Sequence, residues 1–99
     1  MSAADETARS EKVIRELVVS NKVGIHARPA AMFVKAATRY ECDVFLEKDG
    51  ERINGKSIMG LLMLAAGPGC ALKMETNGMD AEQAANELEG LFNNKFGEE

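Results

Sequence analysis

The alternation of apolar and polar positions predicts seven elements of secondary structure along this chain of 99 residues. Short alternating or β-branched runs predict strands, whereas apolar residues at intervals of three and four predict helices. The predicted strands cover residues 12–20, 42–46, 51–54 and 71–75, and the predicted helices cover residues 27–38, 58–64 and 81–94. The elements therefore follow the order strand, helix, strand, strand, helix, strand, helix.

Turn and capping residues mark the ends of these elements. Asp49-Gly50 is a hairpin signal between the second and third strands, and Asn77-Gly78 predicts a turn after the fourth. Gly67-Pro68-Gly69 ends the second helix. Ser57 and Asp80 stand at the N-cap positions of the second and third helices, where a side-chain oxygen can accept a backbone N–H.

This order predicts an α+β fold of one domain. Three helices on one face of a four-stranded antiparallel sheet give an open-faced two-layer sandwich of order βαββαβα, with the other face in water. We expect residues 12–97 to form this domain and residues 1–11, which are small, polar or charged, to form a flexible tail. The tail lacks the apolar run of a signal peptide or membrane anchor, so no membrane insertion is expected.

Charge and cysteine content narrow the function classes. Sixteen acidic and twelve basic side chains give a net charge of -4, which argues against nucleic acid as a partner. Cys42 and Cys70 lack the paired spacing of a zinc site or a redox motif. We therefore expect two free thiols in a cytoplasmic protein, and no metal.

The one histidine of the chain, His26, lies between the first predicted strand and the first predicted helix. The first N–H groups of a helix have no intrahelical partners and carry the positive end of the helix dipole, so an anion is stabilised there. Arg28 adds a permanent cation, Gly24 permits unusual backbone angles, and Pro29 is tolerated in a first helical turn. These residue types suit a phosphorylated imidazole, although a lone histidine at such a junction is often only a capping or packing residue.

A second block of sequence supports the functional interpretation. Gly24-Ile25-His26-Ala27-Arg28-Pro29-Ala30 is followed, about thirty residues on, by Asn54-Gly55-Lys56-Ser57-Ile58-Met59-Gly60. With both blocks at this spacing, residues 12–97 resemble the histidine-containing phosphocarrier proteins (HPr and NPr) of the bacterial phosphotransferase system.

The resemblance implies that His26 accepts a phosphoryl group on Nδ1 from Enzyme I and passes it to an EIIA-type domain. His26 would then be a covalent carrier rather than a general base, Arg28 would steady the phosphoryl group, and no cofactor would be needed. Ser57 matches the serine that HPr kinase/phosphorylase modifies in many bacteria. Two roles stay open for Ser57, a helix cap and a regulatory switch, and one residue can serve as both.

The second predicted helix has apolar residues on all sides, so part of it must be exposed. In the family this helix docks partners beside the histidine, and methionine suits a surface that adapts to several of them. We assign Leu61 and Leu64 to the core. The docking candidates are Ala27, Lys35, Ile58, Met59, Leu62 and Met63.

The sequence leaves two alternatives to the carrier function. Phosphorylation of Ser57 could make the chain a regulatory binding module, but members specialised for regulation can lack the histidine that this chain keeps. A hydrolase using Ser57 and His26 is disfavoured, because no carboxylate is evidently placed to orient the imidazole. Val23 stands where many sugar-branch members have a small polar residue, which puts sugar transport in doubt more than phosphotransfer. The choice between sugar transport and nitrogen control stays open. A small domain with a transient docking face is expected to be a monomer.

Overall fold

The computed structural model describes residues 11–98, so all but the last residue of the predicted tail lies outside the described part. The described chain forms one α+β unit, in which four strands alternate with three helices in the predicted order. The elements are β1 (Lys12–Val18), α2 (Ala27–Ala37), β2 (Asp43–Lys48), β3 (Glu51–Asn54), α3 (Ile58–Met63), β4 (Ala71–Asn77), α4 (Ala81–Asn93) and the short 3-10 turn η1 (Lys95–Gly97).

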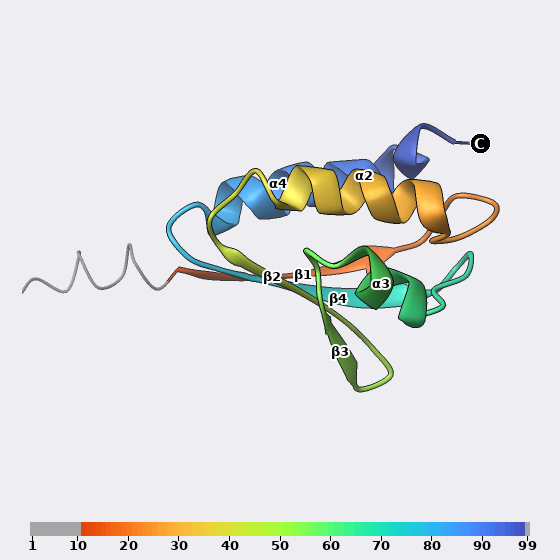
Figure 1. The fold of residues 1–99 in the computed structure, drawn as a ribbon, viewed down its shortest axis with the longest axis horizontal. Coiled ribbons are helices and arrows are strands. Elements are labelled where there is room, and N and C mark those ends of the chain that lie inside the picture. The colour runs from red at the N-terminus through yellow and green to blue at the C-terminus, as the bar shows by residue number, and fades with distance from the viewer. Residues whose placement is uncertain (1–10, 99) are drawn as a thin grey trace, which may run out of the picture.

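The four strands form one antiparallel sheet in the order β1-β4-β2-β3. The register pairs Leu17 with Leu72 and Leu46 with Met74, so apolar side chains from three strands share one face. Helices α2 and α4 lie side by side over that face, and α3 packs against α2 and β3 (Figure 1). The predicted open-faced sandwich is confirmed, because within residues 11–98 the helices lie on one face of the sheet.

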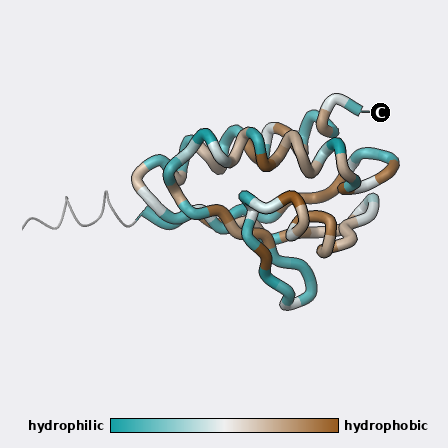
Figure 2. Tube along the Cα trace, viewed as in Figure 1, coloured by the Kyte–Doolittle hydropathy of each residue, from teal (hydrophilic) through white to brown (hydrophobic). Residues whose placement is uncertain are grey.

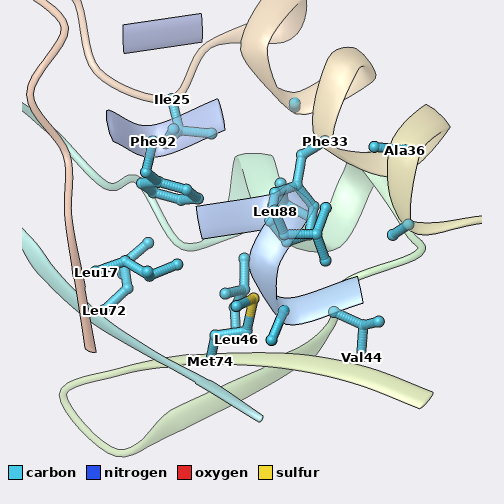
Figure 3. Packing of buried hydrophobic residues seen from close by; sticks show 14 of the residues in the cluster. Leu17, Ile25, Phe33, Ala36, Val44, Leu46, Leu72, Met74, Leu88 and Phe92 are labelled. Atoms are coloured by element: carbon cyan, nitrogen blue, oxygen red, sulfur yellow. The ribbon is translucent and has the colours of Figure 1, made fainter. Parts of the chain in front are cut away.

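The core lies between the sheet and the two long helices (Figure 3). Burying such side chains stabilises the fold by roughly 1.5–3 kcal/mol each. Phe33, Phe92 and Phe96 are buried in an edge-to-face series, with ring centroids 6.0 Å apart for Phe33 and Phe92 and 4.9 Å apart for Phe92 and Phe96. Phe96 lies beyond the periodic part of the last predicted helix, so helical spacing does not predict its burial. It fixes the C-terminal segment to the body of the protein.

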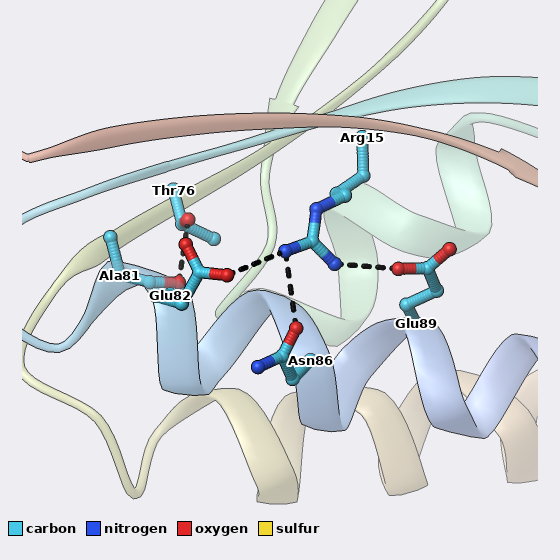
Figure 4. A network of polar contacts seen from close by, with 6 residues as sticks. All are labelled: Arg15, Thr76, Ala81, Glu82, Asn86 and Glu89. Carbon is cyan, nitrogen blue, oxygen red and sulfur yellow. Dashed lines mark hydrogen bonds and ion pairs between the residues drawn. The ribbon is translucent and has the colours of Figure 1, made fainter.

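Arg15 ties the edge strand β1 to α4 (Figure 4). Its guanidinium donates to Glu89 Oε1 at 2.6 Å, to Asn86 Oδ1 at 3.1 Å and to Glu82 Oε2 at 3.2 Å. The three acceptors are spaced along one face of α4, as positions three and four apart in a helix should be. One charged side chain thus connects two elements that are distant in the sequence.

The open face of the sheet carries its own polar cluster. Glu75 accepts from Arg52 Nη1 at 3.2 Å and from Asn77 Nδ2 at 2.9 Å, and the Arg52 guanidinium lies 4.2 Å from the centroid of the Phe45 ring. The hydrogen bond from Arg52 is the main cause that lowers the pKa of Glu75. Glu75 is therefore held ionised although it is largely buried.

Two local predictions can be compared directly with the structure. Asp49 and Gly50 have φ of 53° and 83°, the pair of positive values that a two-residue hairpin of type I′ requires. Asp80 does precede α4, but its side chain makes no capping bond there. It accepts instead from the backbone N–H groups of Glu41 and Cys42, at 2.9 Å each, so the capping role predicted for Asp80 is wrong.

Candidate functional site

Helix α2 begins directly after His26, as predicted, and His26 occupies its N-cap position without a side-chain capping bond. Its backbone is extended, with φ of -107°, and its carbonyl accepts the N–H of Ala30 at 3.0 Å. The N–H groups of Ala27 and Arg28 precede the first intrahelical hydrogen bond, and the His26 side chain makes no capping bond to them, so they can face an anion. The His26 side chain is 40% exposed, so a large partner can reach the ring.

Gly24 holds the loop before His26 against the loop after α3. Its φ is +83°, and a Cβ at this position would lie 2.7 Å from the carbonyl oxygen of Ala66. Next to it, the N–H of Ile25 donates to the same Ala66 oxygen at 2.9 Å. Only glycine combines this backbone conformation with so close an approach. The contact places His26 and the end of α3 in one part of the molecule.

A carboxylate lies against the imidazole. Oε2 of Glu98 is 3.1 Å from Nε2 of His26, and Oε1 accepts from Nδ2 of Asn21 at 2.9 Å. The expectation that no carboxylate orients the imidazole is therefore wrong. The sequence pattern could not place Glu98, because the chain turns back toward α2 only after the last predicted helix.

Arg28 extends from the first turn of α2 toward solvent. Its side chain is 66% exposed, and Nη1 lies 3.7 Å from Oε2 of Glu98. An ion pair of this length at an exposed side chain is weak, so the guanidinium can turn to another anion at little cost. The structure thus brings the two predicted site residues, His26 and Arg28, together around a third that was not predicted.

Ser57 caps α3, as the sequence predicts. Its Oγ accepts the N–H of Gly60 at 3.0 Å. Leu61 and Leu64 are buried, and Met59 is 67% exposed, so the predicted division between core and surface of this helix is confirmed. The apolar colour of α3 is visible beside the sheet in Figure 2. The exposed residues, here called the α3 patch, are Ile58, Met59, Leu62 and Met63.

The other docking candidates lie on α2. Ala27 and Lys35 are exposed, Ala27 directly after His26 and Lys35 two turns further on. Within residues 11–98 no hydrogen bond joins Ser57 to His26, so the pair does not form a nucleophile and base. In the same part of the chain no helix is long and apolar enough to cross a membrane. No group of three potential ligands there could hold a metal ion.

Asn21 was also missed as part of the site. The residue is fully buried, and its Nδ2 donates to the carbonyl of Gly24 at 2.7 Å as well as to Glu98. Asparagine is common in turns, so the residue type points only to a local role for Asn21. Its link to the C-terminal segment has no signature in the sequence.

The comparisons with known proteins agree on one family. A family profile described as "PTS HPr component phosphorylation site" matches residues 13–94. The phosphocarrier protein HPr of Treponema pallidum is 45% identical over 87 residues, which cover 88% of this chain and 99% of that protein. The HPr-like protein Crh of Bacillus subtilis is 46% identical over 76 residues, which cover 77% and 89%.

Solved structures give the same result for the fold. A crystal structure of HPr from Thermoanaerobacter tengcongensis superimposes with a TM-score of 0.85 at 40% identity, covering 88% of this chain and 98% of the other. A crystal structure of Bacillus subtilis Crh, described as a swapped dimer, gives a TM-score of 0.69 at 44% identity, covering 75% and 85%. The resemblance read from the two sequence blocks is thereby confirmed.

Proposed function

The chain belongs to the HPr family of phosphocarrier proteins of the phosphotransferase system, and from this membership we propose that His26 is its phosphoryl carrier. His26 accepts the group from a phosphohistidine of Enzyme I and passes it to a histidine of an EIIA-type domain. The observation that carries the proposal is the position of His26, whose partly exposed ring stands at the N-terminus of α2 beside Arg28.

The chemistry needs few groups. Nδ1 of His26 attacks the phosphorus, an N–P bond forms, and the bond to the donor nitrogen breaks with its electron pair returning to the donor ring. The N–H groups of Ala27 and Arg28 and the guanidinium of Arg28 stabilise the phosphoryl oxygens. An exposed site with one mobile cation releases the group readily in the second transfer. The protein is thus a covalent intermediate that each cycle regenerates, and the transfer requires no cofactor.

The α3 patch supports docking next to this site. Four exposed apolar side chains on a six-residue helix leave an apolar surface that a partner can cover. The contacts of Gly24 and Ile25 with Ala66 join the loop after α3 to the loop before His26, so a partner on the patch also reaches the ring. Exposed Lys35 on α2 supplies a charge contact for an acidic partner, and Ala27 lines the approach to His26.

The test is incubation of the protein with Enzyme I and phosphoenolpyruvate, followed by intact mass and acid lability. The expected result is one acid-labile phosphoryl group on the wild type and none on His26→Ala. Arg28→Ala should keep the acceptor but slow the transfer. Absence of phosphate on the wild type, with an Enzyme I that is active on another carrier, would refute the proposal.

A regulatory role of Ser57 is the second candidate. It is favoured by the similarity to Crh, which one solved structure describes as a catabolite repression protein. A phosphate on Ser57 would add negative charge at the start of the α3 patch and repel acidic partners. Incubation with HPr kinase/phosphorylase and ATP tests this role, because the expected acid-stable phosphate should be absent from Ser57→Ala.

Assembly and location complete the proposal. We propose a cytoplasmic monomer, since transient docking through the α3 patch needs that surface free. A crystal structure of an HPr dimer from Thermoanaerobacter tengcongensis shows that a 42% identical relative can pair, so the oligomeric state requires measurement. Light scattering of the purified protein should give the mass of one chain. The downstream branch, sugar transport or nitrogen control, depends on which EIIA-type domain accepts the phosphoryl group from His26.

A further inference from the structure

The carboxylate of Glu98 contacts three other side chains. It meets His26 Nε2 at 3.1 Å and Arg28 Nη1 at 3.7 Å with one oxygen, and Asn21 Nδ2 at 2.9 Å with the other. The Glu98 side chain is only 14% exposed, although the residue lies beyond the last long helix. Both oxygens of Glu98 therefore have assigned partners.

The backbone before Glu98 makes a left-handed turn, and this turn brings the Glu98 carboxylate to His26. Lys95, Phe96 and Gly97 have φ of 55°, 52° and 73°, a left-handed conformation that is unfavourable for the two residues with side chains. Burial of the Phe96 ring against Phe92 stabilises the turn. The C-terminal turn and the start of α2 lie at the same end of the molecule (Figure 1). The fold thus maintains an unfavourable turn that delivers one carboxylate to His26.

The contact fixes the proton of the imidazole. An ionised carboxylate can only accept hydrogen bonds, so Nε2 of His26 must be the donor. In a neutral ring the proton then resides on Nε2 and the lone pair on Nδ1. The nitrogen that must attack phosphorus is thereby left free.

We propose that Glu98 is a positioning residue for phosphoryl transfer, which selects the Nε2–H form of His26. This inference rests on the proposed carrier function. As Nδ1 gives its lone pair to phosphorus and the donor N–P bond breaks, positive charge develops on the His26 ring. The Nε2 proton stays in place, and the Glu98 carboxylate stabilises the charge. In the second transfer the ring leaves as the same neutral Nε2–H form.

Asn21 makes the proposal testable with a small substitution. Nδ2 of Asn21 donates to the Gly24 carbonyl, which can only accept, so the orientation of the Asn21 amide is fixed. In Glu98→Gln the amide oxygen must face Asn21, and the amide NH₂ must face Nε2 of His26. Nε2 then becomes an acceptor and the proton moves to Nδ1, where it blocks the attack. Glu98→Ala removes the contact without imposing the wrong form.

The first measurement is the ¹⁵N chemical shift of the two ring nitrogens at about pH 9, where imidazole is neutral. We expect the Nε2–H form in the wild type and a shift toward the Nδ1–H form in Glu98→Gln. Glu51→Gln, at the exposed start of β3, removes the same charge elsewhere and should match the wild type. Unchanged ring signals in Glu98→Gln would overturn the proposal.

The second measurement is the rate of phosphorylation by Enzyme I. Transfer should slow about tenfold or more in Glu98→Gln, and by a smaller factor in Glu98→Ala. Equal slowing of both variants would indicate a merely structural role and overturn the proposal. A wild type that shows the Nε2–H form but takes no phosphate would refute the carrier function instead. The two failures are therefore distinguishable.

Discussion

The backbone N–H of Cys42 donates to the carboxylate of Asp80 at 2.9 Å, so the residue before α4 also holds the chain that enters β2. The N–H of Glu41 donates to the other carboxylate oxygen at the same distance. Desolvation alone would raise the pKa of Asp80, but these hydrogen bonds outweigh it and keep the pKa below its ordinary value of 3.8. One carboxylate thus joins two loops at the end of the sheet.

Replacing Asp80 should lower stability in a pH-dependent way. Asp80→Asn keeps one acceptor oxygen and loses the charge, at a cost of about 1–3 kcal/mol at neutral pH. Because the folded pKa is lowered, this contribution is fully present above pH 3.8 and is lost as the pH falls through the folded value. Urea unfolding between neutral pH and about pH 2 should show the two proteins converging in acid; a constant difference would contradict this.

The two thiols should differ in reactivity. Burial, with the Asp80 carboxylate nearby, raises the pKa of Cys42 to about 11, so little of the reactive thiolate forms near neutral pH. Cys70 is free and partly exposed. Iodoacetamide should therefore alkylate Cys70 in the folded protein and both residues in urea. Peptide mapping after partial labelling reads the result, and modification of Cys42 ahead of Cys70 would refute it.

Substitution of Gly24 should damage both stability and the site. Gly69 is a matched control, because its φ of +84° equals that of Gly24 within a degree while its Cβ would meet open space. Gly69→Ala should lower the free energy of unfolding by about 1–2 kcal/mol for the backbone conformation alone. Gly24→Ala adds a clash with the Ala66 carbonyl and should lose roughly 1–3 kcal/mol more. Equal losses in thermal unfolding would show that the close approach does not matter.

The α3 patch can be tested with a second exposed methionine. Met59 is 67% exposed on α3, and Met79 is 72% exposed in the turn before α4. Met59→Asp should raise the KM of Enzyme I for this protein about tenfold. A charge placed in an apolar interface loses the apolar contact and must be desolvated when the two proteins bind. Met79→Asp should leave the KM unchanged. Equal KM values for the Met59 and Met79 variants would refute docking at the α3 patch.

The elements could be predicted from sequence because each has a local cause. Alternating or β-branched runs predicted the strands, and helical spacing predicted α2 and α4. Ser57 was predicted as the N-cap of α3, and its Oγ accepts the N–H of Gly60. Asp80 was misassigned because a cap residue was expected to use its oxygen on its own helix. Its partners, Glu41 and Cys42, lie about forty residues earlier, and a local pattern carries no information on such a contact.

The functional site likewise contains residues that a local motif predicts and residues that it does not. His26 and Arg28 are two residues apart, so one motif contains both. Glu98 lies 72 positions from His26, and its approach depends on the left-handed turn at Lys95 and on the burial of Phe96. Neither lysine nor phenylalanine is typical of positive φ, so no residue type indicated that the chain would turn there.

The order of strands in the sheet determines when β1 can pair during folding. Within the described chain β1 pairs only with β4, and the register joins Val18 to Ala71 and Lys12 to Asn77. Closing so long a loop is entropically unfavourable until many contacts form together. During synthesis the β2–β3 hairpin can form alone, whereas β1 must wait until most of the chain has left the ribosome. Of the four described strands, β1 is therefore made first but is among the last to be paired.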